Sequence, residues 1–188
     1  MGASTSLPAI VALTGFMGAG KSTIGSALAS LLHWRFVDLD SEIESRSGTT
    51  IKEIFARQGE PRFRQLEAEV LQSVLQQASR ETVVALGGGT FVQSQNAALL
   101  QRHGVHVVFL EIEVAELLQR CHFASHSAAD NLRPLFTDAE GFRALYAQRL
   151  PSYQKAGLTI SASGKPAEQI AQEIAAALHL SSRAHGDR

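Results

Sequence analysis

The sequence predicts a three-layer α/β/α fold in which helices cover both faces of a central parallel sheet of about five strands. Short apolar runs alternate with amphipathic segments along most of the 188 residues, which is typical of parallel sheets buried on both sides. A glycine-rich loop joins the first apolar run to the first amphipathic segment. Because ligands of such sheets bind beyond the carboxyl ends of the strands, the residues after each strand are the candidates for chemistry.

The alternation predicts one domain over residues 9–180, with disordered tails at residues 1–8 and 181–188. No internal repeat or Pro/Gly-rich linker divides the sequence into two cores. The predicted strands are residues 10–14, 35–40, 82–89, 105–112 and 158–162. The predicted helices are residues 22–32, 41–48, 50–59, 62–79, 113–121, 139–157 with a break near Pro151, and 166–180.

Composition indicates a globular protein without a nucleic-acid or membrane partner. Apolar residues make up 45% and charged residues 19% of the sequence, and the formal net charge is −1. The single cysteine excludes an intramolecular disulfide framework and favours the cytoplasm, and every apolar run is too short to span a membrane. The N-terminus matches the permissive myristoylation pattern at Gly2 and Ser6, but we interpret it as a tail of small residues. Nothing indicates a coiled coil or an extensive apolar interface, so we expect a monomer.

A phosphate-binding loop is predicted at residues 15–23, GFMGAGKST, which fit G-x-x-x-x-G-K-[ST] between a strand and a helix. Its glycines allow a tight loop whose backbone N–H groups converge on phosphates at the positive end of the helix. Lys21 would reach the β- and γ-phosphates, and the Ser22 hydroxyl would bind Mg²⁺. The residues expected at the nucleoside triphosphate are Gly18, Ala19, Gly20, Lys21, Ser22 and Thr23. The N-K-x-D motif of guanine-specific GTPases is absent from the sequence.

Two aspartates follow the second predicted strand. Asp38 and Asp40 are two residues apart, so both would point to the same side of an extended chain. One could orient hydrated Mg²⁺ while the other faces a phosphoryl acceptor. The alternative for Asp40 is an N-cap of the next helix, which would explain one aspartate but not both.

Two arginines and a glycine run complete the candidate acceptor side. Arg62 and Arg64 would point in different directions on a helix, and a surface salt bridge with Glu60 or Glu67 is the alternative for either. The glycines at 87–89 end a predicted strand, so that bare backbone can approach a substrate closely. A simple turn would need fewer glycines.

The segment at residues 121–136, CHFASHSAADNLRPLF, carries side chains that could bind a metal or catalyse hydrolysis. Cys121, His122, His126 and Asp130 recur at helical spacing, with two serines among them. A metal site needs such ligands on a rigid element, but the serines, an asparagine and a proline weaken helix continuation. A hydrolytic triad would also need an oxyanion hole, which no nearby motif supplies. We therefore favour a solvated, flexible arm.

In this order, the segments GFMGAGKST, DLD, GEPRFR, LGGG, RPLF and RLPSYQ resemble those of the shikimate kinase family. The resemblance covers roughly residues 9–178. It implies a fold like that of the small nucleoside-monophosphate kinases. It also implies transfer of the γ-phosphate of ATP, with Mg²⁺, to the 3-hydroxyl of shikimate, in the biosynthesis of chorismate and aromatic amino acids.

The resemblance further implies roles for individual residues. Asp40 would contact the ring hydroxyls and act as the base, and Asp38 would lie near the magnesium shell, through water. Arg64 and Arg149 would grip the substrate carboxylate, whereas Arg62 stays outside the site. The substrate-binding residues would be Asp40, Arg64, Gly87, Gly88, Gly89 and Arg149. The catalytic residues would be Lys21, Asp40 and Arg133.

A mobile lid is implied at about residues 121–136. Arg120 before it would pack on adenine, and Arg133 near its end would close over the transferring phosphoryl group. The separation between these arginines looks longer than in the usual lid of the family. The adenine loop would lie around residues 163–166, which include Lys165.

Two alternatives to shikimate phosphorylation stay open at this point. A related P-loop kinase could phosphorylate another small polyol acid, such as gluconate. A non-catalytic sensor could keep the pocket without transfer, although Lys21, Ser22, Asp40 and Arg133 are all present. An acidic residue facing the acceptor fits a polyol better than a nucleoside monophosphate, whose phosphate calls for positive charge.

Overall fold

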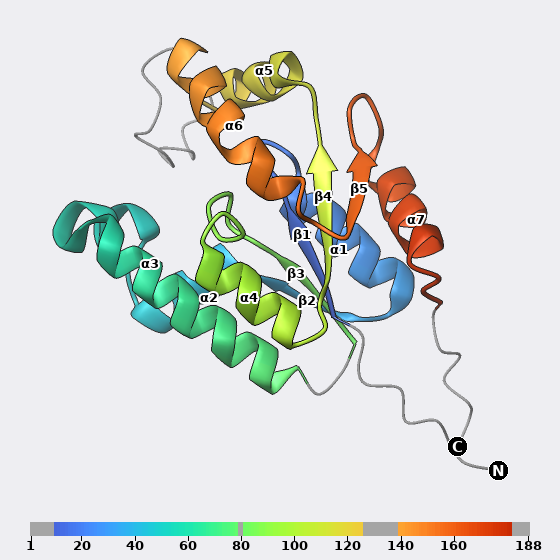
Figure 1. Ribbon diagram of the computed structural model, residues 1–188, viewed down its shortest axis with the longest axis horizontal. Helices are drawn as coiled ribbons and strands as arrows, with labels where there is room; N and C mark the ends of the chain where they lie inside the picture. Colours follow the sequence, from blue (N-terminus) through green and yellow to red (C-terminus); the bar gives the residue numbers. More distant parts are fainter. Residues whose placement is uncertain (1–9, 79–80, 126–138, 182–188) are drawn as a thin grey trace.

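The computed structural model describes residues 10–78, 81–125 and 139–181. Five parallel strands form the central sheet in the order β2-β3-β1-β4-β5 (Figure 1). The strands are β1 (Ile10–Thr14), β2 (Arg35–Asp38), β3 (Thr82–Ala85), β4 (His106–Glu111) and β5 (Leu158–Ser161). The predicted parallel sheet is confirmed, and each of the five predicted strands is present. Two of them are clearly shorter than predicted, because β2 ends at Asp38 and β3 ends at Ala85, before the three glycines.

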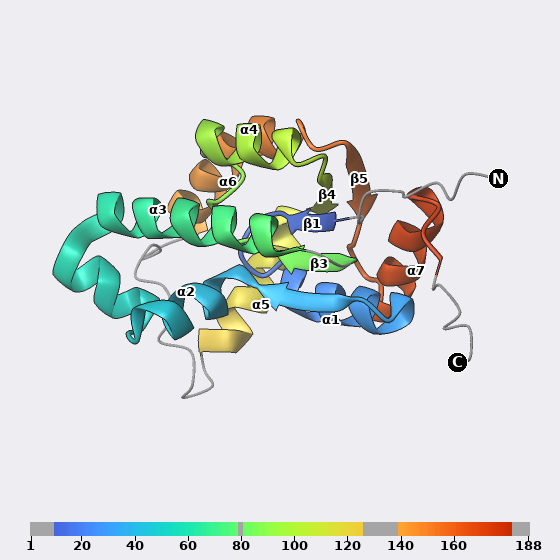
Figure 2. The ribbon, with the colours of Figure 1, turned by 90° about the horizontal axis from the view of Figure 1, so that it is seen from below.

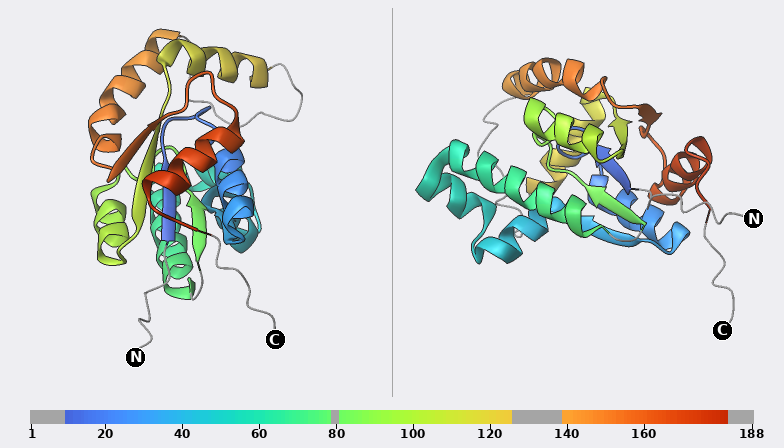
Figure 3. Two further views of the ribbon diagram at one scale, coloured as in Figure 1. Left: turned by 90° about the vertical axis from the view of Figure 1, so that its right-hand side faces the viewer. Right: turned by 60° about the horizontal axis from the view of Figure 1, so that its bottom comes forward.

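Helices cover both faces of this sheet, which confirms the predicted three layers (Figures 2 and 3). The helices are α1 (Lys21–Leu32), α2 (Leu39–Ser47), α3 (Ile51–Gln77), α4 (Ser94–Arg102), α5 (Val114–Ser125), α6 (Ala139–Tyr153) and α7 (Ala167–Ala177). Helices α1 and α7 pack together on one face, and α3 and α4 pack together on the other. Helix α6 lies on the same side as α4, and α5 crosses the end of the sheet to which the strands point.

The central strand β1 is buried along its whole length because each face of the sheet has its own apolar core. Val11 and Leu13 belong to the core shared with α1 and α7, whereas Ile10 and Ala12 face α3. Side chains alternate between the two faces of a strand, so a strand covered on both sides must be apolar throughout. This explains the uninterrupted IVALT run.

Helix α4 and the end of α6 differ from the prediction. Helix α4 was not predicted, because its apolar residues span little more than one turn and its buried inner face includes Asn96. Helix α6 shows no break at Pro151 and continues to Tyr153. A proline removes the hydrogen bond to the carbonyl four residues earlier, and in the last helical turn that loss leaves the remaining turns intact.

Two other boundaries bear on the site. Helix α3 is kinked at Gly59, which has φ 76° and ψ 172°, as the predicted break between two helices requires. Helix α5 continues through Ser125, so the first residues of the expected lid are helical. The rest of that segment, at residues 126–138, and nearly all of the expected tails lie outside the described residues. Within the described ranges, no helix is long and apolar enough to cross a membrane.

Candidate active site

Segments that carry predicted site residues follow β1, β2 and β3 directly and converge at one end of the sheet. All five strands are parallel, so their carboxyl ends share this edge (Figure 1). The phosphate loop follows β1, Asp38 ends β2, and residues 87–89 come shortly after β3. The predicted adenine loop follows β5 at the same edge.

The phosphate loop has the backbone that its glycines were predicted to allow. Gly18 and Gly20 both have φ 78°, a left-handed conformation that disfavours a side chain, and Gly20 is the N-cap of α1. Lys21, the first residue of α1, donates from Nζ to the carbonyl oxygens of Gly15 and Phe16, each at 3.0 Å. The lysine head therefore lies over the loop, at the amino end of a helix, where a phosphate would be held.

Asp38 is the N-cap of α2, so the alternative that Asp40 caps this helix is wrong. Its Oδ1 accepts the backbone N–H of Ser41 at 3.1 Å, and its Oδ2 accepts the Ser22 hydroxyl at 2.5 Å. The helix begins at Leu39, so Asp40 lies in its first turn and is not its cap. The inference that Asp38 and Asp40 share one side of an extended strand is therefore wrong for Asp40.

The Ser22–Asp38 pair fits the magnesium chemistry expected of this loop. Mg²⁺ prefers hard oxygen ligands and is usually bound through one or two protein oxygens, with water and substrate phosphates completing the shell. A hydroxyl and a carboxylate lie together here, beside the phosphate loop. Among the described residues, no group of three or more His, Cys, Asp or Glu side chains could form a dedicated metal cage.

The three glycines after β3 form a backbone strip that polar side chains from α2, α3 and α6 approach. A Cβ placed on Gly87 would lie 2.7 Å from Asp40 Oδ1, and one on Gly89 would lie 2.7 Å from Arg64 Nη2. Between them, the Gly88 carbonyl accepts hydrogen bonds from Arg149 Nη1 at 3.4 Å and from the Tyr153 hydroxyl at 2.5 Å. Each glycine of the strip thus lies beside a different predicted substrate-binding side chain.

Arg64 is held in place by two carboxylates. Its Nη1 donates to Glu67 Oε2 at 3.0 Å, and its Nε and Nη2 donate to Glu60 Oε1 at 3.2 and 3.0 Å. The alternative of a surface salt bridge holds for Arg64 only in part. Its partner Glu60 is 61% exposed, but Arg64 itself is 17% exposed and its second partner, Glu67, only 1%. Arg62 does form a surface salt bridge, since it is 40% exposed and lies 3.8 Å from an acidic side chain. Its partner, however, is Glu69 and neither Glu60 nor Glu67.

Glu67 joins the arginine to the loop that carries the glycine strip. Its Oε1 accepts the Thr90 hydroxyl at 2.6 Å while its Oε2 accepts Arg64. Burial raises the pKa of Glu67, and the nearby Asp40 charge adds to that effect, while the bonds from Thr90 and Arg64 oppose it. Asp40, Arg64, Glu67 and Gly87 therefore form one coupled group on the β2–β3 side of the site.

The opposite side, beyond β1, brings Arg120 and the predicted adenine loop together. Arg120 donates from Nη1 to the Gly18 carbonyl at 3.3 Å and from Nη2 to Glu116 Oε1 at 2.5 Å. The same oxygen of Glu116 accepts the backbone N–H of Gly164 at 3.4 Å. Lys165, in contrast, donates to Glu173 of α7 at 2.7 Å.

A family model for shikimate kinases matches residues 17–179. The chain belongs to the shikimate kinase family. A shikimate kinase from Moorella thermoacetica is 40% identical over 174 residues, which cover 92% of this chain and 95% of that protein. One from Geobacter metallireducens is 43% identical over 169 residues, or 87% and 88% of the two chains.

Solved structures of shikimate kinases have the same fold. The Acinetobacter baumannii enzyme in complex with shikimate has a TM-score of 0.82 and 35% identity, and the match covers 92% of this chain and 93% of that one. The Aquifex aeolicus enzyme has a TM-score of 0.75 and 32% identity, with 90% and 96% covered. A gluconokinase from Sinorhizobium meliloti, at 18% identity and a TM-score of 0.55, shares the fold alone. The gluconate alternative is therefore not favoured.

The sequence did not identify three residues that form hydrogen bonds with the predicted site residues. Glu67 follows Arg64 by three residues, Tyr153 follows Arg149 by four, and Glu116 precedes Arg120 by four. Residues three or four apart on a helix lie on the same face, so this spacing from each predicted arginine could have identified all three. Glu67 was considered only as a partner in a surface salt bridge.

Three residues of the expected lid lie in a segment that the structure does not describe, whereas Cys121 lies in α5. Arg133, His126 and Asp130 lie among the residues that are not described, so their roles stay predictions. Cys121 belongs to α5, and a Cβ on Gly18 of the phosphate loop would lie 3.0 Å from its Sγ. The cysteine thus packs against the nucleotide loop.

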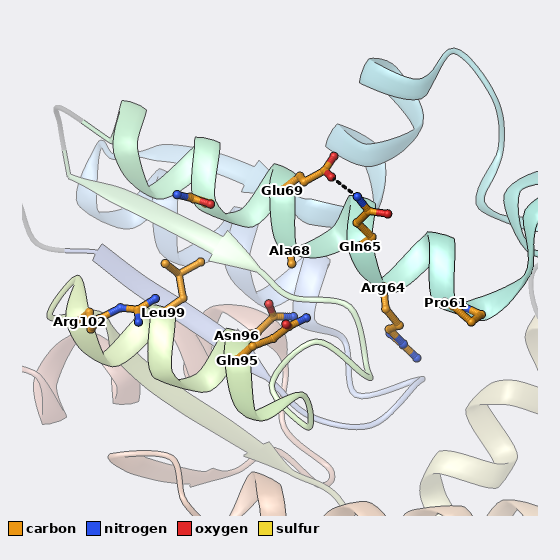
Figure 4. A pocket seen from close by; sticks show the side chains of 10 residues that line it. Pro61, Arg64, Gln65, Ala68, Glu69, Gln95, Asn96, Leu99 and Arg102 are labelled. Atoms are coloured by element: carbon orange, nitrogen blue, oxygen red, sulfur yellow. Dashed lines mark hydrogen bonds between the residues drawn. The ribbon is translucent and has the colours of Figure 1, made fainter.

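A surface groove between α3 and α4 lies beside Arg64 (Figure 4). It is lined by Pro61, Arg64, Gln65, Ala68, Glu69, Gln72, Gln95, Asn96, Leu99 and Arg102. The phosphate loop, Asp40 and the glycine strip are not part of its lining. We therefore place the active site of this shikimate kinase family member at the strand ends. Asn96 links the groove to the site, because its Nδ2 donates to the Thr90 carbonyl at 3.2 Å.

A methyl group at Gly89 should weaken acceptor binding without unfolding the protein. In Gly89→Ala the new Cβ would lie within 3.0 Å of three guanidinium atoms of Arg64, so the arginine must move away from its partners. We expect the KM for shikimate to rise about tenfold, the effect of weakening one charge-assisted hydrogen bond. Gly157→Ala is the control, since its Cβ meets only the Val107 carbonyl at 3.9 Å. Equal KM values in the two variants would contradict this role of Gly89.

Replacing Glu67 by glutamine should change the pH dependence of the Tm and raise the KM for shikimate. Because burial raises the pKa of Glu67 above 4.5, its ionisation costs the folded state stability as the pH rises through the folded pKa. Glu67→Gln lacks this titration, so its Tm should fall less than that of the wild type as the pH rises above 4.5. The KM for shikimate should rise about fivefold, because a neutral amide holds Arg64 less firmly. Parallel Tm profiles would show that Glu67 does not titrate as inferred.

Proposed function

We propose that the protein transfers the γ-phosphoryl group of ATP to the 3-hydroxyl of shikimate, giving shikimate 3-phosphate and ADP. The glycine strip carries this proposal, because two guanidinium groups and a carboxylate approach it from three helices. A ring that bears one carboxylate and several hydroxyls needs guanidinium forks at one end and a hydrogen-bonding carboxylate at the other. The relatives at about 40% identity bear the name shikimate kinase, and one related structure holds shikimate.

At the acceptor end, Arg64 and Arg149 would bind the substrate carboxylate, and the strip at residues 87–89 would form the floor of the pocket. Asp40 lies beside Gly87, at the other end of the strip from Arg64. A ring held by its carboxylate at the arginines would therefore present its hydroxyls to Asp40. Fixing the ring in this way places one hydroxyl in line with the γ-phosphorus, and Asp40 would accept the hydroxyl proton.

At the nucleotide end, residues 18–23 would hold the phosphates of ATP. Lys21 would neutralise charge on the β- and γ-phosphates from its position over the loop. Ser22 would bind Mg²⁺ directly and Asp38 through water; the ion, when bound, would shield the phosphate charge that develops during transfer. Arg120 would pack on adenine, and Arg133, on the evidence of the sequence, would approach the transferring group.

A coupled ADP-release assay tests the proposal. Purified protein with ATP, Mg²⁺ and shikimate should release ADP and form shikimate 3-phosphate, detected by mass spectrometry. Lys21→Met, prepared from the same host, controls for contaminating kinases, and gluconate is assayed beside shikimate. No shikimate-dependent ADP release would refute the proposal. Binding of both substrates without turnover would identify a sensor, and turnover of gluconate alone would identify a different kinase.

The proposal includes a cytoplasmic monomer, as expected from the single cysteine and the modest surface hydrophobicity. Leu31, at 42% exposure, is the large apolar side chain that stands out on the described surface. One solvent-facing leucine is far less than a dimer interface needs. Light scattering coupled to size-exclusion chromatography should therefore give a mass near 20.2 kDa.

A further inference from the structure

Glu116 of α5 lies where three segments of the nucleotide side meet. Its Oε1 accepts Arg120 Nη2 at 2.5 Å from its own helix and the backbone N–H of Gly164 at 3.4 Å from the loop between β5 and α7. Arg120 donates onward to the Gly18 carbonyl of the phosphate loop at 3.3 Å. Figure 1 shows this β5–α7 loop rising beside β4 toward α5. One carboxylate oxygen therefore connects the helix to the loop and, through Arg120, to the phosphate loop.

The topology places the nucleoside of ATP on this side, if the proposed function is correct. The glycine strip and Asp40 follow β3 and β2, whereas Glu116 and Gly164 follow β4 and β5. Strand β1, with the phosphate loop at its end, lies between β3 and β4. In an in-line transfer the leaving ADP points away from the acceptor. The base must then extend from the phosphate loop toward Arg120 and the β5–α7 loop.

We propose that Glu116 is a positioning residue for the nucleoside of ATP, which fixes Arg120 and the loop at Ser163–Gly164 as two walls of the base site before the nucleotide binds. A long arginine side chain and an exposed loop lose conformational freedom when a ligand orders them, and this cost weakens binding. A carboxylate that fixes the arginine and the loop before the nucleotide binds removes part of this entropic cost. Glu116 thereby increases nucleotide affinity without contacting the phosphates.

The environment of Glu116 differs from that of an ordinary pair on a helix surface. Partial burial raises its pKa, but the bonds from the Gly164 N–H, Arg120 and Ser163 outweigh this effect and hold the pKa below its usual value. The carboxylate therefore stays ionised at neutral pH. Ser163 is itself fixed, since its hydroxyl accepts the Glu113 N–H at 3.0 Å. Both ends of the connection between α5 and the loop are thus anchored.

Two probes separate the base site from the phosphate loop. ADP would contact both the base site and the phosphate loop, whereas inorganic tripolyphosphate would contact the phosphate loop alone. In Glu116→Ala we expect the Kd for ADP, measured by titration calorimetry, to rise about tenfold while the Kd for tripolyphosphate stays within twofold. Glu116→Gln, which keeps an acceptor for Gly164 but loses the charge, should be intermediate and serves if the alanine variant is unstable. The KM for ATP should rise in parallel, with the KM for shikimate unchanged.

Glu42→Gln is a matched control. Glu42 and Arg46 form an ion pair with the same i, i+4 spacing, at 2.7 Å and with exposures of 29% and 35%, against 27% and 34% for Glu116 and Arg120. This control should leave both Kd values unchanged. An equal loss for both probes in the Glu116 variants, no loss for ADP, or the same loss in the control would overturn the inference. Because neither probe requires turnover, an absence of shikimate phosphorylation would refute the proposed function alone.

Discussion

Replacing Asp40 by asparagine should lower kcat for shikimate about 10²–10⁴-fold, the usual contribution of a positioned base. Asparagine keeps the size and can still hydrogen-bond a hydroxyl, but it cannot accept the proton. The KM for shikimate should change little, since Arg64 and Arg149 would hold the carboxylate at a distance from this substitution. Steady-state kinetics with both substrates varied gives the two constants separately.

The same substitution should leave the protein at least as stable as the wild type. The Asp40 charge contributes to the raised pKa of the buried Glu67, so removing it relieves a repulsion between like charges. Thermal unfolding near pH 7 checks this expectation. Glu42→Gln, in the same helix, controls for loss of negative charge. A kcat within threefold of the wild type would show that Asp40 is not the base.

Replacing Arg64 by alanine should raise the KM for shikimate about 100-fold or more, with a smaller effect on kcat. Its side chain is partly buried and its guanidinium is held by Glu60 and Glu67, so it meets the carboxylate already oriented. Two charge-assisted hydrogen bonds are lost, each of about 1.5–3 kcal/mol. Arg64→Lys should recover only part of the affinity, because an ammonium cannot form a planar, bidentate contact.

Arg62→Ala is the control for this experiment. It removes an arginine of the same helix that is 40% exposed and lies 3.8 Å from its acidic partner. The Arg64 variant should also be less stable, by up to about 3–5 kcal/mol, because Glu67 loses the partner of a buried charge pair. Unfolding curves for both variants separate this loss from the kinetic effect. A similar rise of KM in both variants would indicate a general effect of charge.

Much of the fold was predictable because its signals are local. The apolar run at β1 gave the strand limits that the structure shows, and Gly59 gave the kink in α3. Helix α4 was not predictable in this way, since burial of Asn96 depends on the Thr90 carbonyl from another segment. The predicted break at Pro151 is absent, because the proline lies in the last turn of α6, only two residues before the helix ends. The first of these errors depends on a tertiary contact, and the second depends on how close the proline lies to the helix end.

The candidate site was predictable where a motif names the residue. The phosphate loop, Arg64, Arg149 and the glycine strip lie where one pocket would need them. The geometry of Asp38 and Asp40 was not predictable, because it depends on where β2 ends and α2 begins. Glu67 and Glu116 carry no motif of their own. Their importance follows from what they hold in place.

The glycine strip has a consequence for inhibitors of the proposed enzyme. The floor of the pocket is backbone, and a side chain at Gly87 or Gly89 would collide with Asp40 or Arg64. A compound that rests on this floor contacts atoms that a point mutation cannot exchange. A resistance mutation in the strip would displace the residues that bind the natural substrate. Such a mutation would therefore also lower the activity of the enzyme.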